Sequence, residues 1–151
     1  MIGVEFVEEL HTAAIRNIAR FPHRRMRCGE ITPVHEDGAR FGFPEAPLVV
    51  YFNNPFSERI MAAVLANLRS SYRRQPRPMI VVYQQLTAEE ERHSTENLRL
   101  LDDQDFLSPR RPRFSLLDRL RLSQYTIELH ETPEAAALTR PNTRPASRRT
   151  G

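Results

Sequence analysis

The chain lacks lysine and tryptophan and has a single cysteine, Cys28, among its 151 residues. One cysteine cannot form an internal disulfide, which excludes a disulfide-stabilised scaffold and indicates a reducing compartment. The longest unbroken apolar run, Ile60 to Ala66, has seven residues, far fewer than the ~20 that a membrane-spanning helix needs. We therefore expect a cytoplasmic protein without a membrane partner.

Glycine is also scarce, and the five glycines form neither a G-x-G turn nor a phosphate-binding loop. This excludes the common loops that cradle phosphate groups. The five histidines have no spacing typical of a metal site, so we predict no bound metal. Cys28 has no sequence context typical of a nucleophile, and an unreactive thiol is expected.

All 22 basic residues are arginine, and 19 residues are acidic. Four arginines fall in residues 139–151, which contain no acid, so residues 1–138 hold 18 arginines against 19 acids. The net positive charge therefore comes from the C-terminal segment. Such a segment could bind nucleic acid, and a solvated, disordered end is the simpler interpretation.

Hydrophobic periodicity predicts strands that alternate with helices. In chain order it predicts a strand at 2–6, a helix at 7–21, a strand at 30–36, a loop at 39–47, a strand at 48–52, a helix at 57–74, a strand at 79–83, a helix from a capping box at 87–90 to about 101, a loop at 102–112, a strand and turn at 113–122, and a strand at 125–130. The continuous apolar runs at 48–52 and 79–83 are typical of strands buried on both faces.

This alternation is typical of an α/β fold with a Rossmann-like, doubly wound and mostly parallel sheet. The last strands would add an antiparallel C-terminal edge. We expect one domain over residues 1–135, followed by an Arg- and Pro-rich disordered tail over 136–151.

Polar residues follow three predicted strands at their carboxyl ends, where such sheets bind ligands. Glu5 could accept both hydroxyls of a ribose, or it could simply be an acid that leads the next helix. Asp37 could accept from an exocyclic amino group, or only stabilise its turn with Gly38. The segment from Asn53 to Phe56 could hold a planar amino group, or form an Asn-Pro turn with Phe56 in the core.

Four short motifs occur together and in order: Gly3-Val4-Glu5-Phe6 followed by Glu8-Glu9-Leu10, then Asp37, then Asn53 to Phe56, then Arg77-Pro78 before Val81-Val82-Tyr83. This constellation resembles the class I S-adenosylmethionine-dependent methyltransferases, most of all a bacterial branch. The resemblance covers about residues 1–135. It implies methyl transfer from S-adenosylmethionine to an acceptor that the sequence does not identify.

The resemblance also implies roles for individual residues. Glu5 and Phe6 would bind the cofactor, with Glu5 holding its ribose, and Asp37 and Gly38 would face its adenine. Asn53, Pro55 and Phe56 would border the transferred methyl group, and Asn53 would also contact the cofactor. Members that methylate amino groups carry Pro or a similar residue at the second position of the Asn53–Phe56 motif. Asn54 departs from that pattern, so the acceptor class stays open.

The family has a first strand and a glycine-rich turn ahead of the strand at 2–6, and the chain as given contains neither. In the family's sheet that strand is central, between the strands at 2–6 and 48–52. We therefore expect an N-terminally truncated domain with impaired activity, through an internal start or a decayed gene rather than a strand from another chain. Its Kd for the cofactor should be weaker than micromolar, a value that corresponds to a binding free energy of about −8 kcal/mol.

Two other functions fit parts of the pattern. A dinucleotide-dependent oxidoreductase also needs an acid after the second strand, but that function does not explain the segment from Asn53 to Phe56. A non-catalytic relic, or an Arg-tailed nucleic-acid-binding module, is the stronger alternative. Salt-dependent binding that is lost with the tail would favour the module.

The tail gives a first prediction. Deletion of residues 139–151 should leave the melting temperature nearly unchanged, because the segment has no apolar periodicity with which to pack. Scanning calorimetry of the full and shortened chains is the measurement. A fall of several degrees would show instead that the segment docks on the domain.

Overall fold

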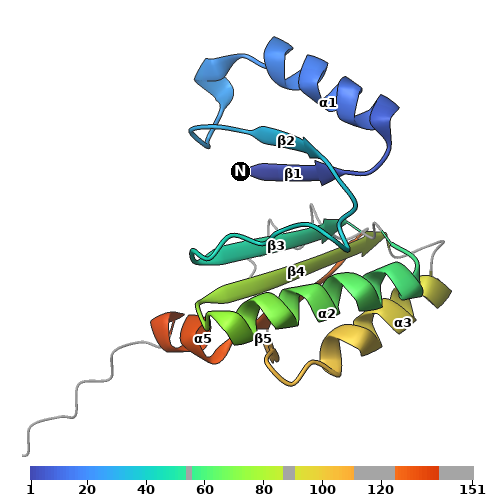
Figure 1. Cartoon of the computed structure of the whole chain (residues 1–151), viewed down its shortest axis with the longest axis vertical. Coiled ribbons are helices and arrows are strands. Elements are labelled where there is room, and N and C mark those ends of the chain that lie inside the picture. The colour runs from blue at the N-terminus through green and yellow to red at the C-terminus, as the bar shows by residue number, and fades with distance from the viewer. Residues whose placement is uncertain (54–55, 87–90, 111–124, 140–151) are drawn as a thin grey trace, which may run out of the picture.

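The computed structural model describes residues 1–53, 56–86, 91–110 and 125–139, and its strands form two sheets (Figure 1). Strands β1 (Ile2–Glu5) and β2 (Thr32–His35) make a parallel pair. The second sheet has the order β3 (Leu48–Asn53), β4 (Met79–Leu86), β6 (Tyr125–Glu131) and β5 (Ser108–Arg110). β3 and β4 are parallel, whereas β6 is antiparallel to both of its neighbours. The predicted α/β class and antiparallel C-terminal edge are confirmed.

Helices connect the parallel strands. α1 (Glu8–Arg20) joins β1 to β2, and α2 (Glu58–Arg74) joins β3 to β4. α3 (Glu91–Asp102) packs beside α2 on one face of the second sheet, and a short 3-10 turn, η1 (His23–Arg25), follows α1 (Figure 1). Among the described helices, none is long and apolar enough to cross a membrane.

The hydrophobic core lies between α2, α3 and the second sheet. The helical periodicity of α2 places Met61, Val64, Leu65 and Leu68 on one face, and all four are buried. The sheet residues that face these helices are Val50 and Phe52 on β3 and Met79, Val81 and Tyr83 on β4. Burial of these side chains, at roughly 1.5–3 kcal/mol each, makes this half the stable part of the fold.

β3 is buried on one face only, and the prediction of a doubly buried strand is wrong there. Val49 and Tyr51 are 65% and 57% exposed. Side chains alternate across a strand, and α2 and α3 cover only the face to which Val50 and Phe52 point. The apolar run is therefore longer than this packing requires, and it leaves an exposed apolar surface on β3.

The unit formed by β1, α1 and β2 has little core of its own. α1 packs against β1 and β2, but none of its residues is fully buried. Leu10 on α1 is 56% exposed, and Ile2 and Val4 on β1 are exposed as well. The apolar surface of this unit thus exceeds what its own three elements cover.

Several boundaries differ from the sequence-based prediction. Strand β5 lies within the segment 102–112, where the sequence predicts only a loop. It forms through pairing with β6 and through an ion pair between Arg110 and Glu131, 2.9 Å apart, and the local sequence pattern does not indicate it. Ser57 occupies the N-cap position of α2, yet its side chain makes no capping hydrogen bond. The capping box at 87–90 and the whole segment at 113–122 lie outside the described residues.

A short helix, α5 (Pro133–Thr139), closes the described chain. The boundary predicted at residue 135 falls inside it. The Thr132 hydroxyl accepts the Met79 amide at 3.0 Å and donates to the Arg77 carbonyl at 3.1 Å. Proline at the first helical position after a threonine suits a helix start. Thr132 therefore ties the start of α5 to the start of β4.

His130 on β6 is buried, although the alternation of apolar and polar residues over 125–130 predicts that it lies on the polar, solvated face of the strand. It pairs with Val81 on β4 and with Pro109 on β5. Burial lowers the pKa of His130 below its ordinary value, and this outweighs the nearby carboxylates of Asp102 and Glu128, which raise it. The ring is therefore neutral in the folded protein at neutral pH.

This burial predicts a pH dependence of stability. As pH falls through about 6.5, His130 in the unfolded chain takes up a proton that the folded chain refuses, so the free energy of unfolding falls until pH reaches the lowered folded pKa. Urea unfolding between pH 7.5 and 5 should show a flatter dependence for His130→Gln than for the native chain. The exposed His35→Gln is the control, and equal slopes for His130→Gln and the native chain would contradict the argument.

Candidate functional site

Three polar residues lie at the carboxyl ends of strands that run in one direction. Figure 1 shows β1, β2 and β3 pointing the same way, so that their ends share one edge of the molecule. Glu5 ends β1, Asp37 follows β2 and Asn53 ends β3. This edge is where ligands bind in open α/β sheets, and it is the candidate site.

Glu5 is half-buried, and one of its carboxylate oxygens accepts the backbone amide of Val7 at 2.9 Å. This contact is the one expected of an acid that leads a helix, since Val7 occupies the N-cap position of α1. A carboxylate has a second oxygen with its own lone pairs. The neighbouring Phe6 is 70% exposed, and its carbonyl lies 2.9 Å from Nε2 of His35.

Asp37 and Gly38 form the turn that follows β2. One Asp37 carboxylate oxygen accepts the Ala39 amide at 2.9 Å, and the Asp37 carbonyl accepts the Arg40 amide at 2.8 Å. Asp37 therefore stabilises its own turn. A Cβ on Gly38 would lie 3.2 Å from Cζ of Phe56, so glycine is what permits this close approach.

Asn53 is exposed at the end of β3, and Phe56 is half-buried beyond it. Asn54 and Pro55 lie outside the described residues, so the predicted role of Pro55 has no geometry here. The Phe56 ring meets Phe52 edge-on, with the ring centroids 5.9 Å apart. Phe56 thus joins the core of the second sheet and at the same time contacts the turn of Gly38.

Sequence reasoning missed Asn97 on α3, which fixes the position of Phe56. Asn97 is fully buried. Its side-chain amide donates to the Phe56 carbonyl at 3.0 Å and to the Tyr83 hydroxyl at 3.1 Å. A buried amide needs such partners, and its position on the inner face of a polar helix was the signal that could have revealed it.

A cavity of about 490 Å³ lies between β1 and β3. It is lined by Met1, Ile2 and Val4 on one side, by Leu48 to Asn53 on the other, and by Gly38, Phe41, Phe43, Pro44, Pro47, Phe56 and Val64 around them. The cavity brings Gly38, Asn53 and Phe56 together. Glu5, Phe6 and Asp37 are not among its lining residues, so the predicted site is only partly assembled.

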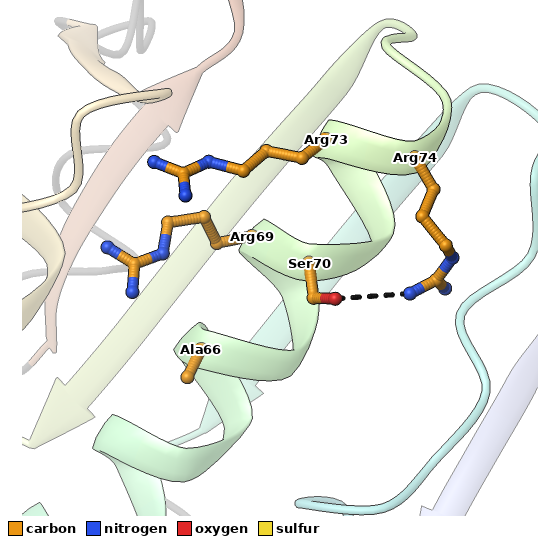
Figure 2. Close-up of a pocket in the computed structure, with 5 residues that line it drawn as sticks. All are labelled: Ala66, Arg69, Ser70, Arg73 and Arg74. Carbon is orange, nitrogen blue, oxygen red and sulfur yellow. Dashed lines mark hydrogen bonds between the residues drawn. The ribbon is translucent and has the colours of Figure 1, made fainter.

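A second hollow, of about 330 Å³, lies on the surface of α2 (Figure 2). Arg69, Arg73 and Arg74 line it together with Ser70, to which Arg74 donates a hydrogen bond. Arg73 forms an exposed ion pair with Asp105 at 2.7 Å. Exposed pairs of this kind contribute little, and the surface reads as a solvated basic face of α2.

Comparisons with protein-family models, with curated proteins and with solved structures found no match to this chain. Within the described ranges, no group of three or more His, Cys, Asp or Glu residues is placed to hold a metal ion. Any functional assignment therefore depends on the geometry of the chain's own residues.

The tie between Asn97 and Phe56 gives a prediction. Asn97→Leu keeps a similar volume but leaves the Phe56 carbonyl without this donor, so it should lower the free energy of unfolding by about 1–3 kcal/mol. Urea denaturation is the measurement. Asn17→Leu, on the exposed surface of α1, should change stability by less than about 0.5 kcal/mol. If Asn97→Leu is as stable as the native chain, Asn97 does not anchor Phe56.

Proposed function

We propose that this chain is the nucleoside-binding part of a Rossmann-like, class I S-adenosylmethionine-dependent methyltransferase. The observation that carries the proposal is the way its chain winds. From β1 the chain moves outward to β2, and from β3 it moves outward in the opposite direction to β4 (Figure 1). Such a reversal between β1 and β3 is a topological switch point, at which doubly wound folds bind nucleosides.

The residues beside this switch point fit the nucleoside half of the cofactor. The second carboxylate oxygen of Glu5 would accept from the ribose, and Asp37 has a second oxygen for the amino group of adenine. Gly38 lets the Phe56 ring pack against the turn that carries Asp37, which places an aromatic ring beside the proposed adenine position. Among the described residues, none forms a glycine-rich turn to hold the methionine half.

Asn53 and Phe56 would act on the methyl acceptor. S-adenosylmethionine, when bound, supplies a methyl group that is already activated, so the protein's task is chiefly to position the acceptor. The exposed side-chain amide of Asn53 would orient the acceptor. Phe56, whose carbonyl accepts a hydrogen bond from Asn97, would exclude water on one side of the acceptor. Pro55 is proposed with them by resemblance alone, and the acceptor itself stays unidentified.

The alternative of a nucleic-acid-binding module has one supporting observation. Arg69 and Arg73 extend from the same side of α2 in Figure 2, and Arg74 lies nearby. The ion pair of Arg73 with Asp105 partly neutralises this face. Methyl transfer is favoured because it also accounts for the residues at the strand ends, which the basic face does not explain.

Glu5 provides the test of the proposed function. Titration with S-adenosylhomocysteine, followed by NMR so that weak binding is measurable, should show Glu5→Ala binding roughly ten- to a hundred-fold more weakly than the native chain. The reason is that hydrogen bonds to a charged group contribute about 1.5–3 kcal/mol.

The matched control is Glu8→Ala, which removes an exposed acid three residues along, in the first turn of α1. It should change affinity by less than about twofold, because a solvated charge is screened. Circular dichroism would establish that both variants fold. Equal affinity of the two variants would remove Glu5 from the site and, with it, the main support for a nucleoside cofactor.

A further inference from the structure

We propose that the face of β3 that α2 and α3 leave open binds an unpaired nucleobase of a single-stranded nucleic acid. The ring of Tyr51 would stack on the base, and the side-chain amide of Gln84 would donate hydrogen bonds to the edge of the base. The inference goes beyond the proposed function, because it concerns a base of a separate nucleic acid and not the cofactor.

The open face of β3 comprises Val49, Tyr51 and Asn53. Side chains alternate across a strand, so these three point away from the core, which the intervening residues Val50 and Phe52 enter. Tyr51 is 57% exposed, and Val49 beside it is 65% exposed. The open face therefore presents to solvent an aromatic ring with an apolar neighbour.

A hydrogen bond fixes the Tyr51 ring in place. The Tyr51 hydroxyl donates to Oε1 of Gln84 on β4, at 2.5 Å. Tyr51 pairs with Val82, two residues before Gln84, so the ring reaches from β3 to β4 and leans across the sheet. A ring that is held at both ends has little conformational freedom left to lose when a ligand stacks on it. This preorganisation suits a stacking surface for a base.

Gln84 supplies hydrogen-bond donors beside the ring. It lies on the same face of the sheet as Tyr51, since it alternates with the buried Tyr83. Its Oε1 accepts the Tyr51 hydroxyl, which leaves the two hydrogens on Nε2 as donors. Asn53, which is exposed, pairs with Gln84 in the strand register. Two side-chain amides therefore lie beyond the ring, toward the carboxyl ends of the strands, where the edge of a stacked base would lie.

Charge complementarity favours a nucleobase as the occupant. Val49, Tyr51 and Asn53 line the cavity beside β3, and the side chains that line this cavity include no Asp, Glu, Arg or His. A phosphate or a carboxylate placed there would lose its hydration without a counter-charge. A nucleobase is uncharged, has a flat face for the ring and carries acceptor atoms for the Gln84 donors. The net charge of +3 on the chain complements the phosphates on either side of such a base.

Binding of a short single strand tests the proposal. The probe is a thymidine hexamer, and the ligand control is a hexamer with the same sugar-phosphate backbone but no bases. Fluorescence anisotropy at fixed salt should show the native chain binding the thymidine hexamer about tenfold or more tightly than the control, because only the former can stack on Tyr51. The cofactor is absent and thymine is not its base, so failure here is distinguishable from failure of the proposed function.

Three variants separate the ring from the donors. Tyr51→Leu removes the ring and should reduce the preference for the thymidine hexamer to less than about twofold. Gln84→Glu still accepts the Tyr51 hydroxyl but lacks the N–H donors, so it should reduce the preference about threefold or more. The added charge repels both strands alike, since their phosphates are the same, so the ratio of affinities reports the lost donors. Gln75→Glu, at the exposed C-cap of α2, is the matched control and should change that ratio by less than about twofold.

Three outcomes would overturn the proposal. The first is that the native chain does not bind the thymidine hexamer. The second is equal affinity for the two strands, which would assign binding to phosphate contacts alone, as expected of the arginines in residues 139–151. The third is a preference that survives Tyr51→Leu, which would place the base elsewhere on the chain. Circular dichroism establishes that each variant folds, and Gln84→Glu decides the matter if Tyr51→Leu does not fold.

Discussion

The structure depends on where the backbone hydrogen bonds of β3 are satisfied. On one side β3 is bonded to β4, and its buried face packs on α2, so this half of the strand is fully supported. On the other side it faces β1 across a cavity. A buried backbone group without a partner costs about 1–3 kcal/mol. The arrangement is therefore stable as it stands only while that edge stays in contact with water.

The same constraint explains the contrast between the two sheets. The second sheet carries almost the whole core. At its edge the Arg77 guanidinium donates hydrogen bonds to the carbonyls of Ala46, Ser71 and Gln75, which ties the neighbouring loops together. Burial lowers the pKa of Arg77, although Glu45 opposes the change. The β1–α1–β2 unit has no comparable anchor among the described contacts. Of its exposed apolar residues, Ile2 and Val4 line the cavity beside β3, whereas Leu10 does not.

The elements that the sequence predicts well are those whose pattern is local. The apolar face of α2 is periodic within one segment, and it is buried in the structure. β5 and the burial of His130 depend instead on pairing between segments that are distant in the chain, and no local pattern encodes such pairing. The prediction that the strand at 48–52 is buried on both faces fails for a related reason. An apolar composition shows that both faces of a strand could be buried, but it does not show which elements cover them.

The candidate site shows the same division. Glu5, Asp37 and Asn53 were found because each ends a strand, and their shared edge follows from parallel topology alone. Asn97 was not found, since its importance comes from one tertiary contact with Phe56. β3 links the site to the cavity, because its carboxyl end carries Asn53 while its free edge faces β1. Among the described strands, no backbone pairing joins β1 to β3, so none fixes the separation of Asn53 from Glu5. A ligand that needs both residues would bind tightly only when that distance is fixed, because otherwise binding must supply the ordering itself.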